Sequence, residues 1–166
     1  MPALLSVFVL CTAAIFQSTL LPHLAVLGVK VDLVMLLVAA WSIRRGVEAG
    51  LVWALIGGVA VDVLSAGPFG LSIVTLALVA VIAGGFGPGL RRSSIILPLV
   101  LIPLVSIVAT LVGALILQAV GHPISWPVVV AMVVLPAALL DTLAVLIVYP
   151  LISIADHRLS TVEWPN

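Results

Sequence analysis

Charged residues are scarce in this chain, and their scarcity excludes most classes of protein. The 166 residues include six Lys and Arg and six Asp and Glu, so only 7% are charged and the formal net charge is zero. Soluble domains carry about 25% charged residues, whereas 64% of this chain is hydrophobic. A nucleic-acid binder also needs a basic patch, which is absent here. The composition therefore predicts an integral membrane protein and excludes a soluble enzyme, a nucleic-acid binder and a disordered chain.

Cysteine, clustered histidines and nucleotide-binding motifs are missing as well. Cys11 is the only cysteine, which excludes an intrachain disulfide and a cysteine-based metal site. His23, His122 and His157 are dispersed along the sequence, without metal-ligand spacing. The glycine-rich stretch 84–89 lacks the Lys-Ser/Thr pair of a phosphate-binding loop. We therefore expect no catalytic site, no metal and no cofactor.

Apolar runs separated by Pro, Gly and charged residues occupy nearly the whole chain. A membrane-spanning helix needs about 20 apolar residues, and we assign six spans: Ala3–Leu21, Leu33–Ile43, Ala49–Leu64, Leu71–Phe86, Ser94–Gln118 and Val128–Ala155. The second is short, covering about 17 Å, so it must either borrow from residues 26–31 or thin the bilayer. We predict an all-α integral membrane protein with one compact bundle of six transmembrane helices over residues 1–155 and a tail over 156–166.

Basic residues predict the orientation of these spans. If the N-terminus is cytoplasmic, five arginines lie inside and one lysine outside; these are Arg44, Arg45, Arg91, Arg92 and Arg158, against Lys30. Cytoplasmic loops carry an excess of Lys and Arg, so we expect both termini in the cytoplasm. The two arginine pairs would fix this topology and attract anionic lipids. Trp41 and Trp126 would then lie at the inner and outer membrane interfaces.

The third span carries small residues at every fourth position. Gly50, Ala54, Gly58 and Asp62 form one ridge of the predicted helix, and small residues at this spacing let another helix approach closely. We expect this ridge to pack inside the bundle or against a partner span. Asp62 then has two interpretations: its carboxylate accepts hydrogen bonds from backbone amides of the turn 65–70, or it contacts a ligand or partner.

A second acid, Asp141, lies near the middle of the sixth span, beside Thr142. An acid at mid-bilayer costs about 2.5–3.5 kcal/mol on insertion scales, so it normally faces protein or water. Pro136 precedes it and leaves the carbonyl of Met132 without a helical partner. Asp141 then has three interpretations: it forms a polar clamp between helices, it is a proton or substrate site, or it contacts a partner protein. The candidate partners on the fifth span are Ser106, Thr110 and Gln118.

A series of short motifs runs from Val31 to Ser72. Asp32-Leu33 opens a short run that ends in Trp41 and Arg44-Arg45-Gly46, and Gly50, Gly58-x-x-x-Asp62 and Gly67-Pro68-Phe69-Gly70-Leu71 follow. This order resembles the MreD family of rod-shape-determining membrane proteins, which often show Pro-Asp-Leu, Gly-Leu-x-x-Asp and Pro-Leu-Gly-Leu at these places. Val31, Val59 and Phe69 depart from those patterns, but the spacing is kept.

The resemblance implies a non-enzymatic component of the cell-elongation machinery in a bacterial inner membrane. Members of the family pair with MreC, a single-span protein, and connect MreB filaments to RodA and its transpeptidase partner during peptidoglycan synthesis. Such a chain would act by helix-helix recognition. The candidates for helix packing or partner contact are Gly50, Ala54, Gly58, Asp62, Gly67, Pro68 and Gly70.

A different class of function is the alternative. MreD proteins look similar in size to the substrate-binding subunits of vitamin transporters, and a small-molecule-binding or transport component would place Asp62 and Asp141 in a pocket. A proton-coupled carrier using Asp141 is a third interpretation. A binding protein requires several polar side chains that meet in a cavity of a few hundred Å³, about 300–1,000 Å³ in typical sites, which distinguishes it from a scaffold.

Overall fold

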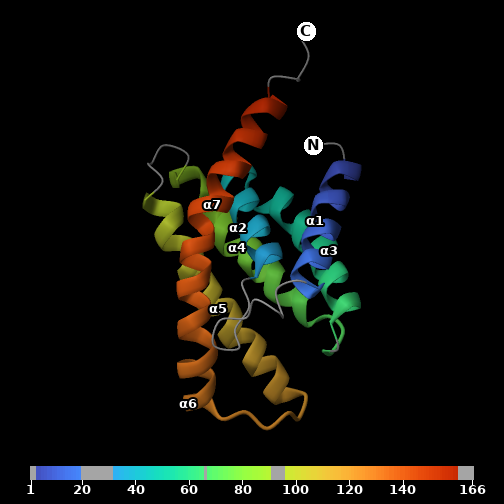
Figure 1. The fold of residues 1–166 in the computed structure, drawn as a ribbon, viewed down its shortest axis with the longest axis vertical. Helices are drawn as coiled ribbons and strands as arrows, with labels where there is room; N and C mark the ends of the chain where they lie inside the picture. Colours follow the sequence, from blue (N-terminus) through green and yellow to red (C-terminus); the bar gives the residue numbers. More distant parts are fainter. Residues whose placement is uncertain (1–2, 20–31, 66, 91–95, 161–166) are drawn as a thin grey trace.

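The computed structural model describes residues 3–19, 32–65, 67–90 and 96–160, and every regular element in these segments is helical. The elements are α1 (Ala3–Thr19), α2 (Leu33–Arg45), α3 (Val47–Leu64), α4 (Leu71–Leu90), α5 (Ile96–Ala119), α6 (Trp126–Val129), the π-helical segment η2 (Val130–Val134) and α7 (Leu135–Ser160). Figure 1 shows them as one bundle of long, roughly aligned helices. The prediction of an all-helical chain is confirmed for the described residues.

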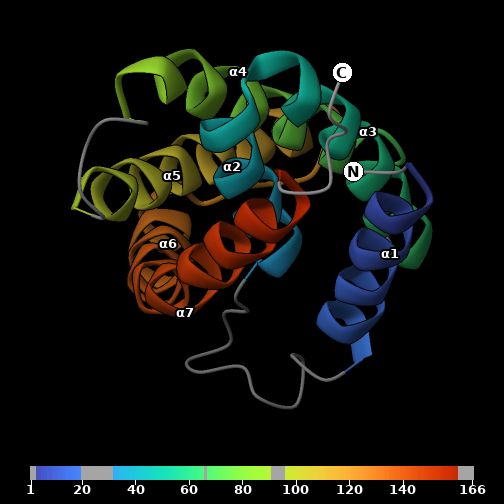
Figure 2. The same ribbon diagram turned by 90° about the horizontal axis from the view of Figure 1, so that it is seen from above.

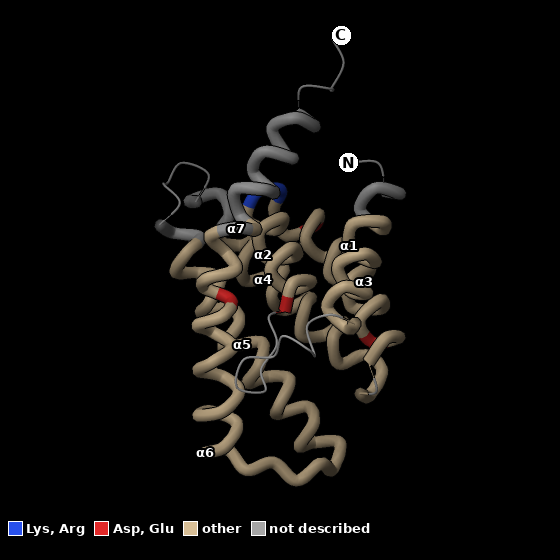
Figure 3. Tube along the Cα trace, viewed as in Figure 1, with Lys and Arg blue, Asp and Glu red and all other residues tan. Residues whose placement is uncertain are grey.

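Among the described residues, three helical stretches are long and apolar enough to cross a membrane, namely Val47–Leu64, Leu99–Ala119 and Trp126–Leu146. Two shorter apolar stretches, Val7–Thr19 and Leu71–Phe86, accompany them. The first turn of α1 and the last turn of α7 lie at the same end of the bundle as the arginine end of α2 (Figures 1 and 3). Arg91, Arg92 and Lys30 lie outside the described residues, and the cytoplasmic termini and the number of spans stay predictions.

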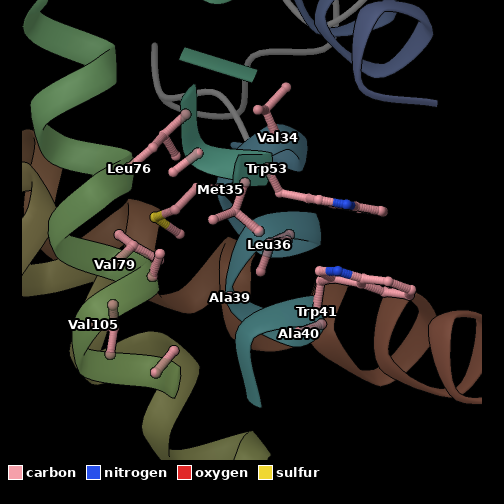
Figure 4. Packing of buried hydrophobic residues seen from close by; sticks show 14 of the residues in the cluster. Val34, Met35, Leu36, Ala39, Ala40, Trp41, Trp53, Leu76, Val79 and Val105 are labelled. Carbon is pink, nitrogen blue, oxygen red and sulfur yellow. The ribbon is translucent and has the colours of Figure 1, made fainter. Parts of the chain in front are cut away.

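The short helix α2 forms the centre of the bundle. It packs against α1, α3, α4, α5 and α7, and Figure 2 shows these helices arranged around it. Nine of its 13 residues are buried, including Val34, Leu36 and Val38, which are fully inaccessible. The side chain of Met35 lies beside those of Leu76 and Val79 of α4 (Figure 4), and all of these residues belong to one buried cluster. The helix is therefore surrounded by protein. Residues 26–31, from which it was expected to borrow length, lie outside the described residues, so that expectation stays a prediction.

Both ends of α2 are fixed by local chemistry. The carboxylate of Asp32 accepts a hydrogen bond from the backbone N–H of Met35 at 2.9 Å, as an N-cap side chain does. At the other end Gly46 has φ +93°, a left-handed conformation that favours glycine, and its N–H donates to the carbonyl of Ser42. Gly46 therefore turns the chain directly into α3 without an intervening loop.

Helices α3 and α4 approach each other closely at both ends of their contact. A Cβ atom at Gly58 of α3 would lie 2.6 Å from the Cα of Ile73 on α4. A Cβ atom at Gly84 of α4 would lie 2.7 Å from the backbone nitrogen of Val47 on α3. Both distances fall well below ordinary carbon contacts of about 3.5–4.0 Å. The pair is therefore held together backbone to backbone, as small residues allow.

The sixth span contains a π-helical segment just before Pro136. The backbone N–H of Leu135 donates to the carbonyl of Val130, five residues earlier. Pro136 follows immediately and has no N–H to donate. The π turn inserts one extra residue before Pro136, and α6, η2 and α7 continue as one rod from Trp126 to Ser160.

Hydropathy misplaced several helix ends. The fourth helix does not stop at Phe86 but continues through Pro88 to Leu90. The sixth runs past Ala155 to Ser160, so the first five residues of the predicted tail are helical. Hydropathy marks where apolar side chains stop, whereas a helix ends where its backbone hydrogen bonds stop, and these places differ.

Trp41 lies inside the bundle, and its place at the inner membrane interface stays a prediction. It is only 4% exposed, like Trp53 on α3. Their rings stack with centroids 4.5 Å apart and planes within 11° (Figure 4), while the guanidinium carbon of Arg45 lies 5.4 Å from the Trp41 ring centroid. The stack therefore joins α2 to α3, and such aromatic pairs are worth about 0.5–1.5 kcal/mol beyond the area that they bury. Trp126 is partly exposed and donates to the side-chain oxygen of Gln118.

Candidate functional site

The small-residue ridge of α3 faces the inside of the bundle. Gly50, Ala54, Gly58 and Asp62 are all buried. A Cβ atom at Gly50 would lie 2.8 Å from the Cβ of Ser42 on α2 and 3.2 Å from that of Ala80 on α4. Of the two expected contacts for this ridge, the structure therefore shows the one within the bundle.

Asp62 holds the turn between α3 and α4. One carboxylate oxygen accepts the N–H of Gly70 at 2.8 Å, and the other accepts the N–H of Ser72 at 3.0 Å. Gly70 has φ +98°, which favours glycine. The predicted hydrogen bonds from the turn to Asp62 are present, with Ser72 as a partner beyond the predicted range. Gly67 and Pro68 belong to this turn, but a Cβ at Gly67 would meet only the Ser65 hydroxyl oxygen, at 3.7 Å.

Asp141 is the centre of a buried polar network. It is 2% exposed, and one carboxylate oxygen accepts the hydroxyl of Ser106 on α5. The other faces the backbone N–H of Asp32, at 3.4 Å. Gln17 on α1 donates to the Asp32 carboxylate at 3.1 Å and accepts the N–H of Val34 at 3.1 Å. The network thus links α1, the start of α2, α5 and α7.

Two members of this network were not assigned a role from the sequence. The sequence pattern includes Asp32 only as the first residue of the Asp32-Leu33 motif, and no pattern includes Gln17. The available signal was an Asp immediately before an apolar helix, a typical N-cap position. Nothing in the sequence shows that this cap lies against the middle of a helix 109 positions later.

The other expected partners of Asp141 make different bonds. Thr110 donates to the carbonyl of Ser106 at 2.9 Å, one turn away on its own helix. Gln118 accepts from Trp126. Thr142 donates to the carbonyl of Ala138 at 2.6 Å, so its hydroxyl is satisfied within α7. Of the three candidates on α5, only Ser106 contacts Asp141, because Thr110 and Gln118 lie further along the same stripe.

A cavity of about 540 Å³ opens beside this network. It lies between α4, α5, η2 and α7, with Asp32 and Met35 of α2 at its inner wall. Its polar lining consists of Asp32, Ser72, Thr75, Ser106, Thr110 and Asp141. The cavity meets the size and convergence required of a small-molecule site. It includes Asp141, whereas Asp62 is not among its lining residues, so the structure does not bring the two predicted acids together.

Within the described part of the chain, no three His, Cys, Asp or Glu residues gather as a metal site. A second hollow of about 530 Å³ is almost entirely apolar and lies between α1 and α3, beside Val7, Cys11, Ile15, Val59 and Val63. Large apolar side chains are also exposed elsewhere, for example Leu139 at 69% and Leu143 at 63% on α7. Such faces are typical of helices that contact lipid or other helices.

The buried central helix, the apolar outer faces and the helices able to span a bilayer define the class: a helical bundle of membrane-protein type. The family model described as rod shape-determining protein MreD matches residues 2–155. The chain therefore belongs to the MreD family, and the resemblance found over residues 31–72 extends to nearly the whole chain. Comparison with curated proteins and with solved structures returned no significant match.

Proposed function

We propose that this protein is a non-enzymatic, multi-pass scaffold of the cell-elongation machinery in a bacterial inner membrane. The family match over residues 2–155 carries this proposal. The fold supports it, because the described residues form only a helical bundle with short connections. Such a chain acts on partners through its helix surfaces and loops.

The proposed partners are a single-span MreC-like protein and, through the assembly, RodA, its transpeptidase partner and MreB. Exposed apolar side chains on several helices support helix-helix recognition, because they offer contact area without polar groups to bury. Arg44 and Arg45 end α2 on the side where α1 begins and α7 ends (Figure 1). Basic residues at a cytoplasmic surface attract anionic lipids by about 1 kcal/mol each.

Photo-crosslinking in the native membrane tests this proposal. A crosslinkable amino acid at Val63, 70% exposed on α3, reports on one face, and one at Leu139, 69% exposed on α7, reports on another. Residue Leu36 is fully buried and provides the matched control. A band with an MreC-like protein from an exposed position, absent from the control, is expected. Depletion of the protein is expected to turn rod-shaped cells round.

The alternative, a small-molecule-binding or transport component, is supported by the cavity beside Asp141. Recovery of an energy-coupling ATPase, with no MreC-like protein, would favour transport and contradict the scaffold. Unchanged cell shape after depletion of the protein would also contradict the scaffold function.

A further inference from the structure

The cavity beside Asp141 changes in character along its length. Helices α5 and α7 pack against each other, and Ser106 meets Asp141 at one level. Leu117 on α5 and Val129 beside η2 line the cavity further along. Since α5 rises about 1.5 Å per residue, Leu117 lies about 16 Å from Ser106. The two carboxylates therefore lie toward one end of the cavity, and the wall toward Leu117 is largely apolar but includes Thr75, which lies beside Gly113.

The polar wall offers hydrogen-bond acceptors but few donors. Three of its hydroxyl groups donate to protein atoms: Thr75 to the carbonyls of Leu71 and Ser72, Thr110 to the carbonyl of Ser106, and Ser106 to Asp141. Their oxygen lone pairs, those of two carboxylates and the hydroxyl group of Ser72 are the remaining polar capacity. Acceptors therefore outnumber donors, and a ligand that complements this wall donates most of its hydrogen bonds.

Charge narrows the ligand class further. Asp32 and Asp141 both line the cavity, and no Lys, Arg or His is found among the described residues around it. Phosphate and carboxylate ligands would meet repulsion there, whereas a cation is attracted by both acids. Hydrogen bonds between an ammonium group and a carboxylate are about twice as strong as neutral ones.

The wall of the cavity away from the carboxylates contains the π-helical segment. Val129 and Val133 line the cavity, and Val130–Val134 is π-helical. Such turns occur frequently at functional sites, where they re-aim side chains of a helix. This is a second feature, independent of the acids, that coincides with the cavity.

We propose that this cavity binds a primary ammonium group carried on an apolar body. The ammonium lies between Asp32 and Asp141, and the apolar body extends past Thr110 toward Leu117 and Val133. The volume of about 540 Å³ suits a molecule of this kind. This binding is additional to the scaffold function and does not depend on it.

Fluorescence titration of the purified full-length protein in phosphatidylcholine nanodiscs tests the proposal. The probe is dansylcadaverine, a primary ammonium on an apolar fluorophore, and its neutral counterpart is dansylamide. The ammonium probe is expected to bind at least about tenfold more tightly, and Asp141→Asn to weaken its binding about tenfold or more, since a charge-assisted hydrogen bond is lost. The asparagine side-chain oxygen can still accept the hydrogen bond from Ser106, so the contact between α5 and α7 is kept.

Asp62→Asn is the matched control. Asp62 is also buried, at 4% exposure, but its carboxylate binds the turn outside the cavity. The dissociation constant of the Asp62→Asn variant for the ammonium probe is expected to stay within about twofold of the wild-type value. Gly113→Leu fills the cavity without changing its charge. A Cβ there meets only Thr75, at an ordinary 3.6 Å, and this variant is expected to lose binding even if Asp141→Asn fails to fold.

Equal affinity for the ammonium probe and its neutral counterpart would overturn the proposal, and so would an equal loss of probe affinity in the Asp141→Asn and Asp62→Asn variants.

Competition with a lipid identifies the source of the ammonium group. Displacement of the probe when phosphatidylethanolamine replaces part of the phosphatidylcholine indicates a lipid headgroup. Retention of the probe indicates a free amine. Cell shape and MreC crosslinking are measured on the same variants, so that failure of amine binding is distinguished from failure of the scaffold.

Discussion

The contact between Gly58 and α4 gives the sharpest prediction about stability. Gly58→Ala adds one methyl group, whose carbon would lie 2.6 Å from the Cα of Ile73 and 2.9 Å from its nitrogen. Carbon atoms in contact are normally about 3.5–4.0 Å apart, so the methyl group is about 1 Å too close. Backbone atoms cannot rotate away, and α3 must therefore separate from α4.

The expected change in the free energy of unfolding of Gly58→Ala combines the cost of overpacking with a gain in helix propensity. Overpacking costs about 1–3 kcal/mol, and a clash with backbone belongs in the upper half of that range. Alanine has a higher helix propensity than glycine by about 1 kcal/mol. The free energy of unfolding should therefore fall by about 1–2 kcal/mol. Gly58→Leu, which adds a longer side chain at the same place, is expected to abolish assembly of the bundle.

Adjacent glycines on α4 provide the control. A Cβ at Gly84 would lie 2.7 Å from the backbone nitrogen of Val47, whereas a Cβ at Gly85 meets nothing within 4 Å. Gly84→Ala should lose about 1–2 kcal/mol, and Gly85→Ala should lose nothing or gain up to about 1 kcal/mol. Unfolding by added denaturing detergent, followed by circular dichroism, measures all three variants. Equal stability of the Gly84 and Gly85 variants, or a Gly58→Ala variant as stable as wild type, would refute the reasoning.

Three further predictions concern other buried contacts. Gly50→Ala should destabilise the bundle and Ser42→Ala should partly rescue it, with a coupling of about 0.5–3 kcal/mol in a double-mutant cycle; additive effects would contradict the packing of α3 on α2. Asp62→Asn keeps one acceptor for the turn, so it should lose less thermal stability than Asp62→Ala, which loses both bonds; equal melting temperatures would argue against that role. Trp53→Ala should cost about 3–5 kcal/mol and alter the fluorescence of Trp41, and an unchanged spectrum would contradict the stack.

The local part of this architecture was predictable from the sequence. The four-residue spacing of Gly50, Ala54 and Gly58 indicated one buried ridge, because helical periodicity alone decides which residues share a face. The bonds from the turn to Asp62 were predictable for the same reason, since the acid and the turn are only a few residues apart. Six helical runs were found because their composition is unmistakable.

Contacts between distant parts of the chain could not be predicted. The network of Gln17, Asp32 and Asp141 depends on how three separate helices cross, and no pattern in one sequence specifies that crossing. Trp41 was assigned to an interface because such positions are common for tryptophan, but its stack with Trp53 depends on the tertiary packing of α2 on α3. The π turn before Pro136 was likewise not predictable, since proline alone does not specify how the helix accommodates it.

The central position of α2 has a consequence for biosynthesis. This helix precedes most of its neighbours in the sequence. Five helices enclose it, and four of them are synthesised later, namely α3, α4, α5 and α7. At 13 residues it reaches about 20 Å, less than the roughly 30 Å hydrocarbon core, so a newly made α2 matches the bilayer poorly on its own. Its stable insertion must wait for the later helices, and ribosome-bound chains that end before α7 should leave Asp32 and its neighbours open to membrane-embedded chaperones and proteases.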